Sequence, residues 1–512
     1  MSQSAAIQSA SSSPWPGRLR NRILLWTFLF LLLGAALRLW RFALGFPLWG
    51  DEAFIALNLE ERTFDQLAQP LRHYQVAPLG FLWLEKLVTL LFGFSEAAVR
   101  LVPCLAGILA LLFFFRLAKI IAPGLASLWA VAILAVSYYP IRHACEVKPY
   151  ATDLLASVLF LWAGAQALKA RPKPLWLLAL GSPVLISLSF PAVFTALAAV
   201  LVPAVHLRQN RRVLFPAIIS FLAISLSFFL HYSLVGKNQF QNEQAKHLAY
   251  WDATFPPANP LFFFPWLAQT HAGNLSAYPV GSRDGGSSLT MVLFLAGIFS
   301  LARKSKWPFL FLLLAPFFLT LLAALPGRFP YGGSARVAQH LAPSICLLAG
   351  LGLAFFLRTI LVKKVFPALG IVLFLALFAL GLGQAARDWL KPYKTTGDEL
   401  TRSAIQTMVA KIDSGNPLQV TREAGQIDPS IEWYLRRGGN KVVFHPGEFP
   451  LEGKSPVSWF WLPPRPPGGD TSAASSPTIP EGWMLLSRQD FTFPLGRDSQ
   501  SKIQFSLLTL EK

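Results

Sequence analysis

Two adjacent carboxylates, Asp51 and Glu52, follow a long apolar run in the stretch GFPLWGDEAFIALNLEER. Residues 22–47 before them are dominated by Leu, Phe, Ala and Trp. The segment after them has apolar residues at helical spacing with charged residues between them, which is typical of a helix lying along a membrane surface. The pair is therefore expected where a membrane span meets water.

Other chemistry-bearing residues lie in three polar segments, RHYQVAPLGFLWLEK (72–86), YYPIRHACEVKPYATD (138–153) and PGRFPYGGSARVAQH (326–340). Acidic and basic residues of this kind could transfer a group from a lipid-linked phosphate. Because the phosphate is already a good leaving group, the reaction needs only one carboxylate, acting as base on an acceptor hydroxyl, and cations that hold the phosphate. The candidate base is Asp51 or Glu52. The candidate phosphate ligands are Arg142, Lys148, Arg336 and Lys86. Further substrate contacts are assigned to His73, Tyr74, Tyr150, Asp153 and Tyr331.

Each assignment has a structural alternative. An acid at a helix start is favoured by the helix dipole alone, and Glu146 with Lys148 could form an exposed ion pair of little energetic value. Glu146 and Asp153 either pair with the cations or join Asp51 on a divalent metal. Asp153 lies about one turn into an apolar segment, where a buried charge costs at least ~2.5–3.5 kcal/mol, so its partner is either substrate or a structural arginine.

The composition indicates an integral membrane protein. The chain has 512 residues, of which 54% are hydrophobic and 14% charged, whereas soluble domains carry about 25% charged residues. Its three cysteines are too few and too scattered for a disulfide framework or a zinc site. We find no nucleotide-binding glycine-rich motif.

A membrane span needs about 20 mostly apolar residues. The sequence predicts eleven, at approximately 23–45, 98–115, 121–138, 151–168, 175–189, 191–207, 214–235, 289–302, 308–325, 338–357 and 366–385. The apolar segment 78–94 is interrupted by Glu85 and Lys86 and is predicted to be a second interfacial helix.

Charge placement predicts the orientation. With the N-terminus in the cytoplasm of a cell (inner or plasma) membrane, the inner segments hold 17 basic residues and no acidic one, as the positive-inside rule requires. The net charge of +19 then reflects topology and does not indicate nucleic-acid binding. All the candidate residues fall on the outer, periplasmic side.

The predicted organisation is a disordered cytoplasmic segment (1–21), a transmembrane domain (22–385) and a C-terminal periplasmic domain (386–512). The last part reads as a small α+β domain. IDPSIEWYLRRGGNKVVFHP predicts a helix that ends at Gly438-Gly439 and then a strand, and VSWFWLP, GWMLLSRQDF and KIQFSLLTL predict further strands.

The segments LWGDEAFIALN, APLGFLWLEKL, SEAAVRLVPCLAGILAL, EVKPYATDLL and FPYGGSARVAQHLAP resemble the GT-C glycosyltransferases. The similarity is to the branch with protein O-mannosyltransferases and the aminoarabinose transferase of lipid A. It implies an all-α polytopic fold and an inverting transferase that uses a polyprenyl-phosphate sugar donor (hexosyl or pentosyl) on the periplasmic side. It also implies that Asp51 is the catalytic carboxylate, with Glu52 beside it, that Glu146 is a further catalytic acid from the second outer loop, and that Arg336 belongs to the site. The acceptor is a glycan, lipid or protein, and the need for a divalent metal, held by Asp51 and Glu146 if present, stays open.

Two other functions compete with a transferase: a transporter or channel, and a non-catalytic lipid-binding assembly protein. Transporters place ionisable groups near the midplane of the membrane, whereas the predicted spans are nearly free of charge. The intact acids Asp51, Glu52 and Glu146 argue against the assembly protein.

Overall fold

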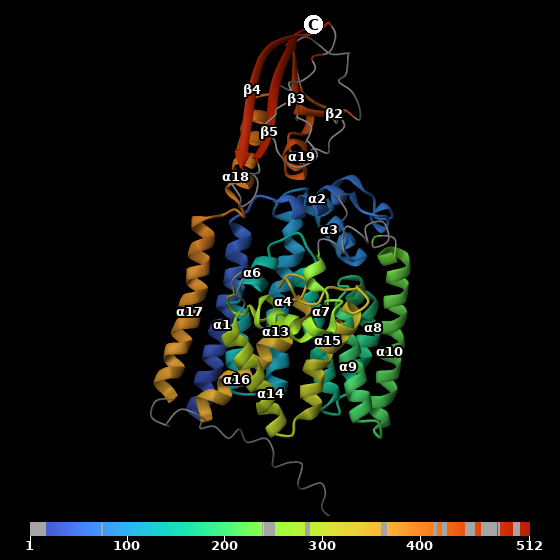
Figure 1. Cartoon of the computed structure of the whole chain (residues 1–512), viewed down its shortest axis with the longest axis vertical. Helices are drawn as coiled ribbons and strands as arrows, with labels where there is room; N and C mark the ends of the chain where they lie inside the picture. Colours follow the sequence, from blue (N-terminus) through green and yellow to red (C-terminus); the bar gives the residue numbers. More distant parts are fainter. Residues whose placement is uncertain are drawn as a thin grey trace, which may run out of the picture. The chain divides into compact units, whose positions relative to one another are not determined.

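The computed structural model is mostly helical, and its chain divides into two compact units (Figure 1). The first comprises Met1–Ala43, Phe64–Leu91 and Arg100–Arg387, and the second comprises Leu44–Thr63, Phe92–Val99 and Asp388–Lys512. The structure describes residues 17–72, 75–237, 239, 251–281, 287–359, 366–412, 417–421, 428–445, 456–461, 479, 482–494 and 502–511.

Each of the eleven predicted spans coincides with a helix of the first unit. The helices are α1 (Gly17–Ala43), α4 (Ala98–Ile121), α5 (Leu125–Ala135), α7 (Tyr150–Ala167), α8 (Lys173–Ser187), α9 (Ala192–His206), α10 (Arg211–His231), α14 (Ser288–Arg303), α15 (Trp307–Ala324), α16 (Ala342–Thr359) and α17 (Phe366–Leu390). Six segments among the described residues are long and apolar enough to cross a membrane, and four further apolar helices are shorter. The fold class is therefore confirmed, while the number of spans stays a prediction.

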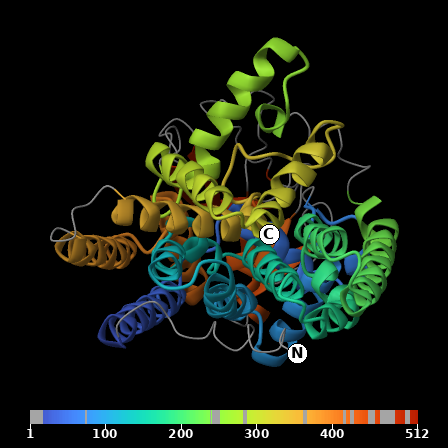
Figure 2. The same ribbon diagram turned by 90° about the horizontal axis from the view of Figure 1, so that it is seen from below.

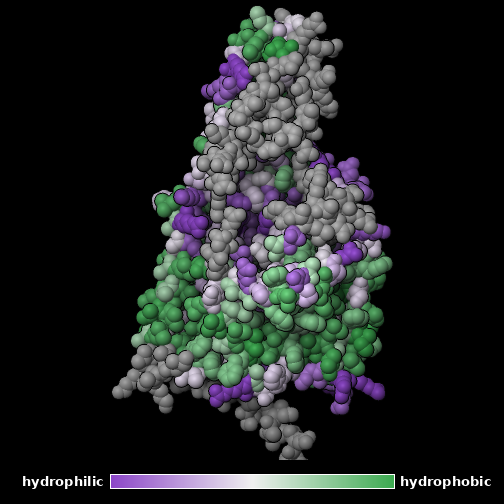
Figure 3. Space-filling model, viewed as in Figure 1, coloured by the Kyte–Doolittle hydropathy of each residue, from purple (hydrophilic) through white to green (hydrophobic). Residues whose placement is uncertain are grey.

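Hydrophobic residues cover much of one face of the first unit. Figure 3 shows hydrophobic residues as a band over the helices on the viewed face, with hydrophilic residues at the end where α14 and α15 are joined. The exposed residues in this joining loop include Arg303, Lys304 and Lys306. Seen from below, α1 and α17 lie at one side of the helical unit, and α8 and α10 lie at the other (Figure 2). Such a belt matches a protein that contacts lipid tails.

Small residues let the central helices approach closely. A Cβ added to Gly352 of α16 would lie 1.8 Å from the carbonyl oxygen of Leu293 in α14, and one added to Gly297 would lie 2.0 Å from that of Leu348. Close backbone packing at glycines is how membrane helices associate where lipid offers no hydrophobic driving force.

Short helices and loops connect these spans at the end where the candidate residues lie. They include α3 (Leu79–Phe92), α6 (Tyr138–His143), α13 (Phe263–Ala272) and several 3-10 turns. α3 has an inverted polarity: Glu85 and Lys86 are buried, while Trp83, Leu87 and Leu91 are exposed. An exposed apolar face is what a helix in contact with lipid presents.

The second unit contains a five-stranded mixed sheet in the order β2-β1-β3-β5-β4. β1 (Leu418–Thr421) pairs in parallel with β2 (Val442–His445) and β3 (Val457–Trp461). β5 (Lys502–Glu511) pairs antiparallel with both β3 and β4 (Met484–Pro494). The unit also holds α18 (Thr396–Lys411) and α19 (Pro429–Arg436).

The second unit also includes α2 (Gly50–Glu61) and Phe92–Val99 from the first predicted loop, together with the residues after 388. Seven residues of α2 are buried, so this helix is more enclosed than the surface-lying helix that its pattern predicts. α1 begins at Gly17, so residues 17–21 are helical in the structure, although the sequence assigns them to a disordered segment.

Replacing Gly352 by Ala should destabilise the packing of α14 on α16, because the added Cβ meets backbone that cannot move aside alone. Overpacking typically costs about 1–3 kcal/mol. We expect a lower thermal unfolding temperature in detergent, with Gly383→Ala as control because a Cβ there meets nothing within 4 Å. Equal melting of both variants would contradict the close approach.

Candidate functional site

Glu146 is the centre of a buried charged cluster in the first unit. α6 carries Arg142 and His143 in its last turn, and the chain then turns so that Glu146 faces both. Arg142 Nε donates to Glu146 Oε1 at 2.6 Å, and His143 Nδ1 lies 2.8 Å from Glu146 Oε2. Glu146 is 5% exposed, so the exposed ion pair considered from sequence is wrong for this residue.

The cluster sets the protonation of its members. Burial lowers the pKa of Arg142, but the Glu146 carboxylate outweighs this effect and holds the pKa above its usual value. Burial also lowers the pKa of His143, against the opposing effect of Glu146, so the imidazole is neutral at pH 7. A neutral ring that donates Nδ1–H to Glu146 leaves Nε2 as an acceptor, and this buried atom has no hydrogen-bond partner among the residues described.

Lys148 and Tyr150 continue the cluster. Lys148 Nζ donates to Gln75 Oε1 at 2.6 Å, which joins the second polar segment to the first. Lys148 is 8% exposed. The Tyr150 ring meets the His143 ring edge-on at 4.8 Å between centroids. Gln75 and His143 were not predicted from the sequence, although the position of His143 three residues before Glu146 was a usable signal.

The 326–340 segment is fixed by the loop that precedes α14. Tyr331 OH and His271 Nε2 share a hydrogen bond of 2.8 Å, and Asn274 Nδ2 donates to Gly333 O at 2.9 Å. Burial lowers the pKa of His271 to about 4, and burial raises that of Tyr331. Both rings are therefore neutral at pH 7, and the Tyr331 hydroxyl is already engaged within the protein.

Arg336 belongs to the same electrostatic environment as His143. Its guanidinium lies 4.9 Å from the centroid of the Trp251 ring, a cation–π arrangement. Its charge contributes to lowering the pKa of His143, after burial, which is the largest effect. Arg336 and the Glu146 cluster are far apart in the sequence and therefore lie in the same region of the first unit only because of the fold.

Two further candidates are buried in helices of the first unit. Asp153 lies in the first turn of α7, is 4% exposed, and its Oδ1 has no hydrogen-bond partner in the described part of the chain. Lys86 of α3 is 8% exposed and its neighbour Glu85 is fully buried. Burial raises the pKa of Glu85 well above its usual value, so folding favours the protonated form of this carboxyl group.

Asp51 and Glu52 occupy the first turn of α2 in the second unit, where the helix dipole favours acidic side chains. The extended backbone at Trp49 starts the helix, and Glu52 N donates to Trp49 O at 2.8 Å. Glu52 is 1% exposed, whereas Asp51 is half-buried. His73 and Tyr74 lie outside the described residues.

A divalent metal is not supported by the donors near Glu146. Both of its oxygens already accept from Arg142 and His143. Among the residues with described positions, no three His, Cys, Asp or Glu side chains are grouped as a metal would need. We therefore derive no step through a metal ion.

One protein-family model matches part of the chain. The family model described as dolichyl-phosphate-mannose-protein mannosyltransferase matches residues 76–235, which hold α3 to α10 and the Glu146 cluster. No curated protein sequence matches the chain.

Solved structures match over most of the chain. ArnT from Cupriavidus metallidurans in the apo state has a TM-score of 0.56 at 14% identity, with 94% of this chain and 97% of that chain covered. The same protein bound to undecaprenyl phosphate has a TM-score of 0.52 at 13% identity, with 94% and 98% covered.

The oligosaccharyltransferase from Archaeoglobus fulgidus, in complex with Zn and sulfate, has a TM-score of 0.50 at 12% identity. The match covers 81% of this chain and only 62% of that one. At these identities the likeness establishes the fold, and the GT-C resemblance predicted from sequence is confirmed.

Because folding favours the protonated form of Glu85, which loses its proton at neutral pH in the unfolded chain, folding stability should fall as pH rises above 4.5, its ordinary pKa. Glu85→Gln removes this dependence. We expect it to raise the unfolding temperature by a few degrees at pH 8, with the gain shrinking as pH falls towards 4.5. The control is Glu511→Gln, an exposed exchange of the same kind. A gain that grows on acidification would refute the buried, protonated state.

Proposed function

We propose that this chain, a polytopic membrane protein with the GT-C glycosyltransferase fold, transfers a sugar from a polyprenyl-phosphate donor to an acceptor hydroxyl on the periplasmic face. The observation that carries the proposal is a group of basic residues from two separate polar segments near Glu146. Arg142 pairs with the Glu146 carboxylate, the backbone N of Lys148 donates to Glu146 O, and the charge of Arg336 acts on the neighbouring His143. The likeness to ArnT, one of whose structures contains undecaprenyl phosphate, supports a lipid phosphate as the leaving group.

The proposed chemistry needs one base and a phosphate site. Asp51 takes the proton of the acceptor hydroxyl as its oxygen attacks the anomeric carbon from the face opposite the phosphate. The bond from that carbon to the phosphate oxygen breaks, and its electron pair leaves with the phosphate. Attack from the opposite face inverts the anomeric configuration.

The cations divide into two roles. Arg142 Nε is engaged by Glu146, so we assign Arg142 and Glu146 to fixing the site. Lys148 and Arg336 are assigned to the departing phosphate, whose charge increases as the bond breaks and which cations then stabilise more strongly than in the ground state. Lys86 is assigned to the donor phosphate before reaction, and Tyr150 and Asp153 to the substrate. With the N-terminus cytoplasmic, these groups face the periplasm.

Asp51→Asn should abolish most turnover, since an amide cannot accept the proton. General-base contributions are typically 10²–10⁴-fold, and we expect kcat to fall in this range while binding of the donor lipid is retained. The measurement is sugar transfer or hydrolysis by purified protein in detergent from a panel of radiolabelled polyprenyl-phosphate sugars. Asp65→Asn, which changes an exposed acid shortly after the end of α2, is the control.

A folded Asp51→Asn variant with full activity would remove Asp51 from the mechanism. If the wild type neither consumes nor binds any donor, the transferase proposal fails. Flux measurements in vesicles would then test the transporter.

Arg336→Ala should weaken donor binding, because it removes a cation from the proposed phosphate site. Hydrogen bonds to charged groups contribute about 1.5–3 kcal/mol, so we expect the donor KM to rise by about ten- to hundredfold. Titration with polyprenyl phosphate alone provides a second readout. Arg328→Ala, an exposed arginine of the same segment, should leave both unchanged.

A further inference from the structure

The helix that carries Asp51 and Glu52 is held by residues from the far end of the chain. Within the second unit, α19 packs against α2, and α18 packs against α19. α2 is separated from α19 by more than 360 residues of sequence, so nothing local requires their association.

The C-terminal end of α2 is bound by two consecutive arginines at the end of α19. Arg436 Nη2 forms an ion pair with Glu61 and also donates to Glu432 Oε1 at 2.6 Å. Arg437 Nη2 is in ion-pair contact with Glu60, though without the alignment of a hydrogen bond. All four paired side chains at this junction are about one-fifth to one-quarter exposed.

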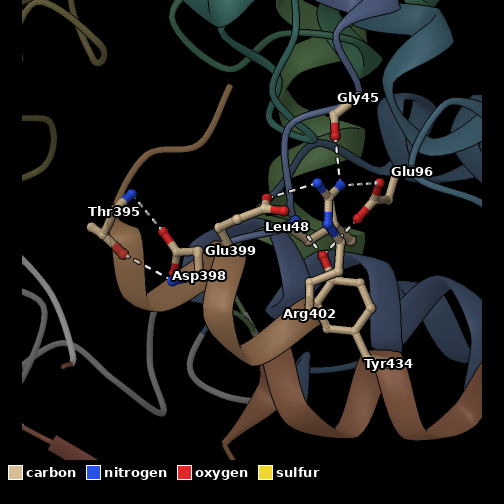
Figure 4. A network of polar contacts seen from close by, with 8 residues as sticks. All are labelled: Gly45, Leu48, Glu96, Thr395, Asp398, Glu399, Arg402 and Tyr434. Carbon is tan, nitrogen blue, oxygen red and sulfur yellow. Dashed lines mark hydrogen bonds and ion pairs between the residues drawn. The ribbon is translucent and has the colours of Figure 1, made fainter. Parts of the chain in front are cut away.

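The chain on the N-terminal side of α2 is bound as well (Figure 4). Arg402 of α18 donates through Nη1 to Gly45 O at 2.7 Å. Tyr434 OH accepts from Leu48 N at 2.9 Å and donates to Glu96 Oε1 at 2.6 Å. Glu96 Oε2 in turn accepts from Arg402 at 3.1 Å.

We propose that α18 and α19 form a brace that positions the Asp51–Glu52 pair, with Arg402, Tyr434, Arg436 and Arg437 as its positioning residues. The inference rests on the proposed function, in which Asp51 is the base. The four positioning residues would act through α2 and would not touch the donor or the acceptor. The bound points lie at residues 45 and 48 on one side of the acid pair and at 60 and 61 on the other.

The chemistry of the contacts favours positioning over simple attachment. Arginine has a planar fork, so the hydrogen-bonded guanidinium groups of Arg402 and Arg436 fix direction as well as distance. Two of the hydrogen bonds reach backbone atoms, Gly45 O and Leu48 N, and therefore restrain the path of the chain before α2. A base must lie within hydrogen-bond reach of its proton, and a misplacement of about 1 Å can cost about a hundredfold in rate.

The first test removes one anchor at a time in the full-length protein. We expect Arg436→Ala to speed amide hydrogen exchange in α2 by at least about tenfold, as local opening becomes easier. It should also lower kcat by about ten- to hundredfold and change the donor KM by less than about twofold, because the proposed phosphate ligands belong to the other unit. Arg436→Lys should recover part of both losses.

Matched variants distinguish loss of the brace contacts from general destabilisation of the protein. Glu61→Gln removes the ion pair with Arg436 from the α2 side. Its combination with Arg436→Ala should cost little more than Arg436→Ala alone, which also removes the contact with Glu432. Arg488→Ala, which breaks an exposed ion pair with Asp490 in β4, should change neither exchange nor kcat.

Unchanged exchange in α2 for both Arg436→Ala and Glu61→Gln would overturn the brace. Faster exchange with unchanged kcat would leave an attachment without a positioning role and would also overturn it. Failure of the proposed function is distinguishable, since it requires an inactive wild type, and the exchange measurement does not depend on activity.

Discussion

The cost of burying an ionised group in hydrocarbon determines where this chain can carry chemistry. Apolar helices fill the first unit, and the charged candidates lie in the short helices and loops that join them or in the first turn of α7. α3 shows the constraint within one helix, because its apolar side chains are exposed while Glu85 and Lys86 are buried. A site for a lipid-linked anion is expected where apolar surface and buried cations meet.

The buried carboxylate of Glu146 has its hydrogen-bond partners within the protein. A buried carboxylate without partners would bind the nearest arginine or lysine and cancel its charge. Here Arg142 and His143 already occupy both oxygens of Glu146, whereas Lys148 is bonded to the uncharged amide of Gln75 and Arg336 lies over the Trp251 ring. The Gln75 amide and the Trp251 ring thus help to hold these two basic side chains in place.

The sequence predicted the helices well because hydropathy is a local property, and all eleven predicted apolar segments coincide with helices. The helix before Gly438 and strands β2 to β5 were also predicted correctly. β1 was missed because four residues, LQVT, are too short to show alternation. Long-range contacts were not predictable. The pairing of Glu61 with Arg436, for example, does not alter the hydrophobic pattern of the sequence around either residue. The roles of Asp51, Glu52 and the phosphate ligands remain predictions, and the partners of Glu146 became known only from the structure.

The pairing of α2 with α19 also concerns the order in which the protein is made. Glu61 and Arg436 are 375 residues apart, and translation adds about 5–20 residues per second. The segment with the acid pair therefore emerges roughly 20–75 s before its partner helix exists. During this interval the spans can insert while α2 lacks its anchors. In a chain that stops short of α19, the helix that carries the proposed base would lack the contacts made by Arg436 and Arg437, so the proposed brace requires synthesis to pass α19.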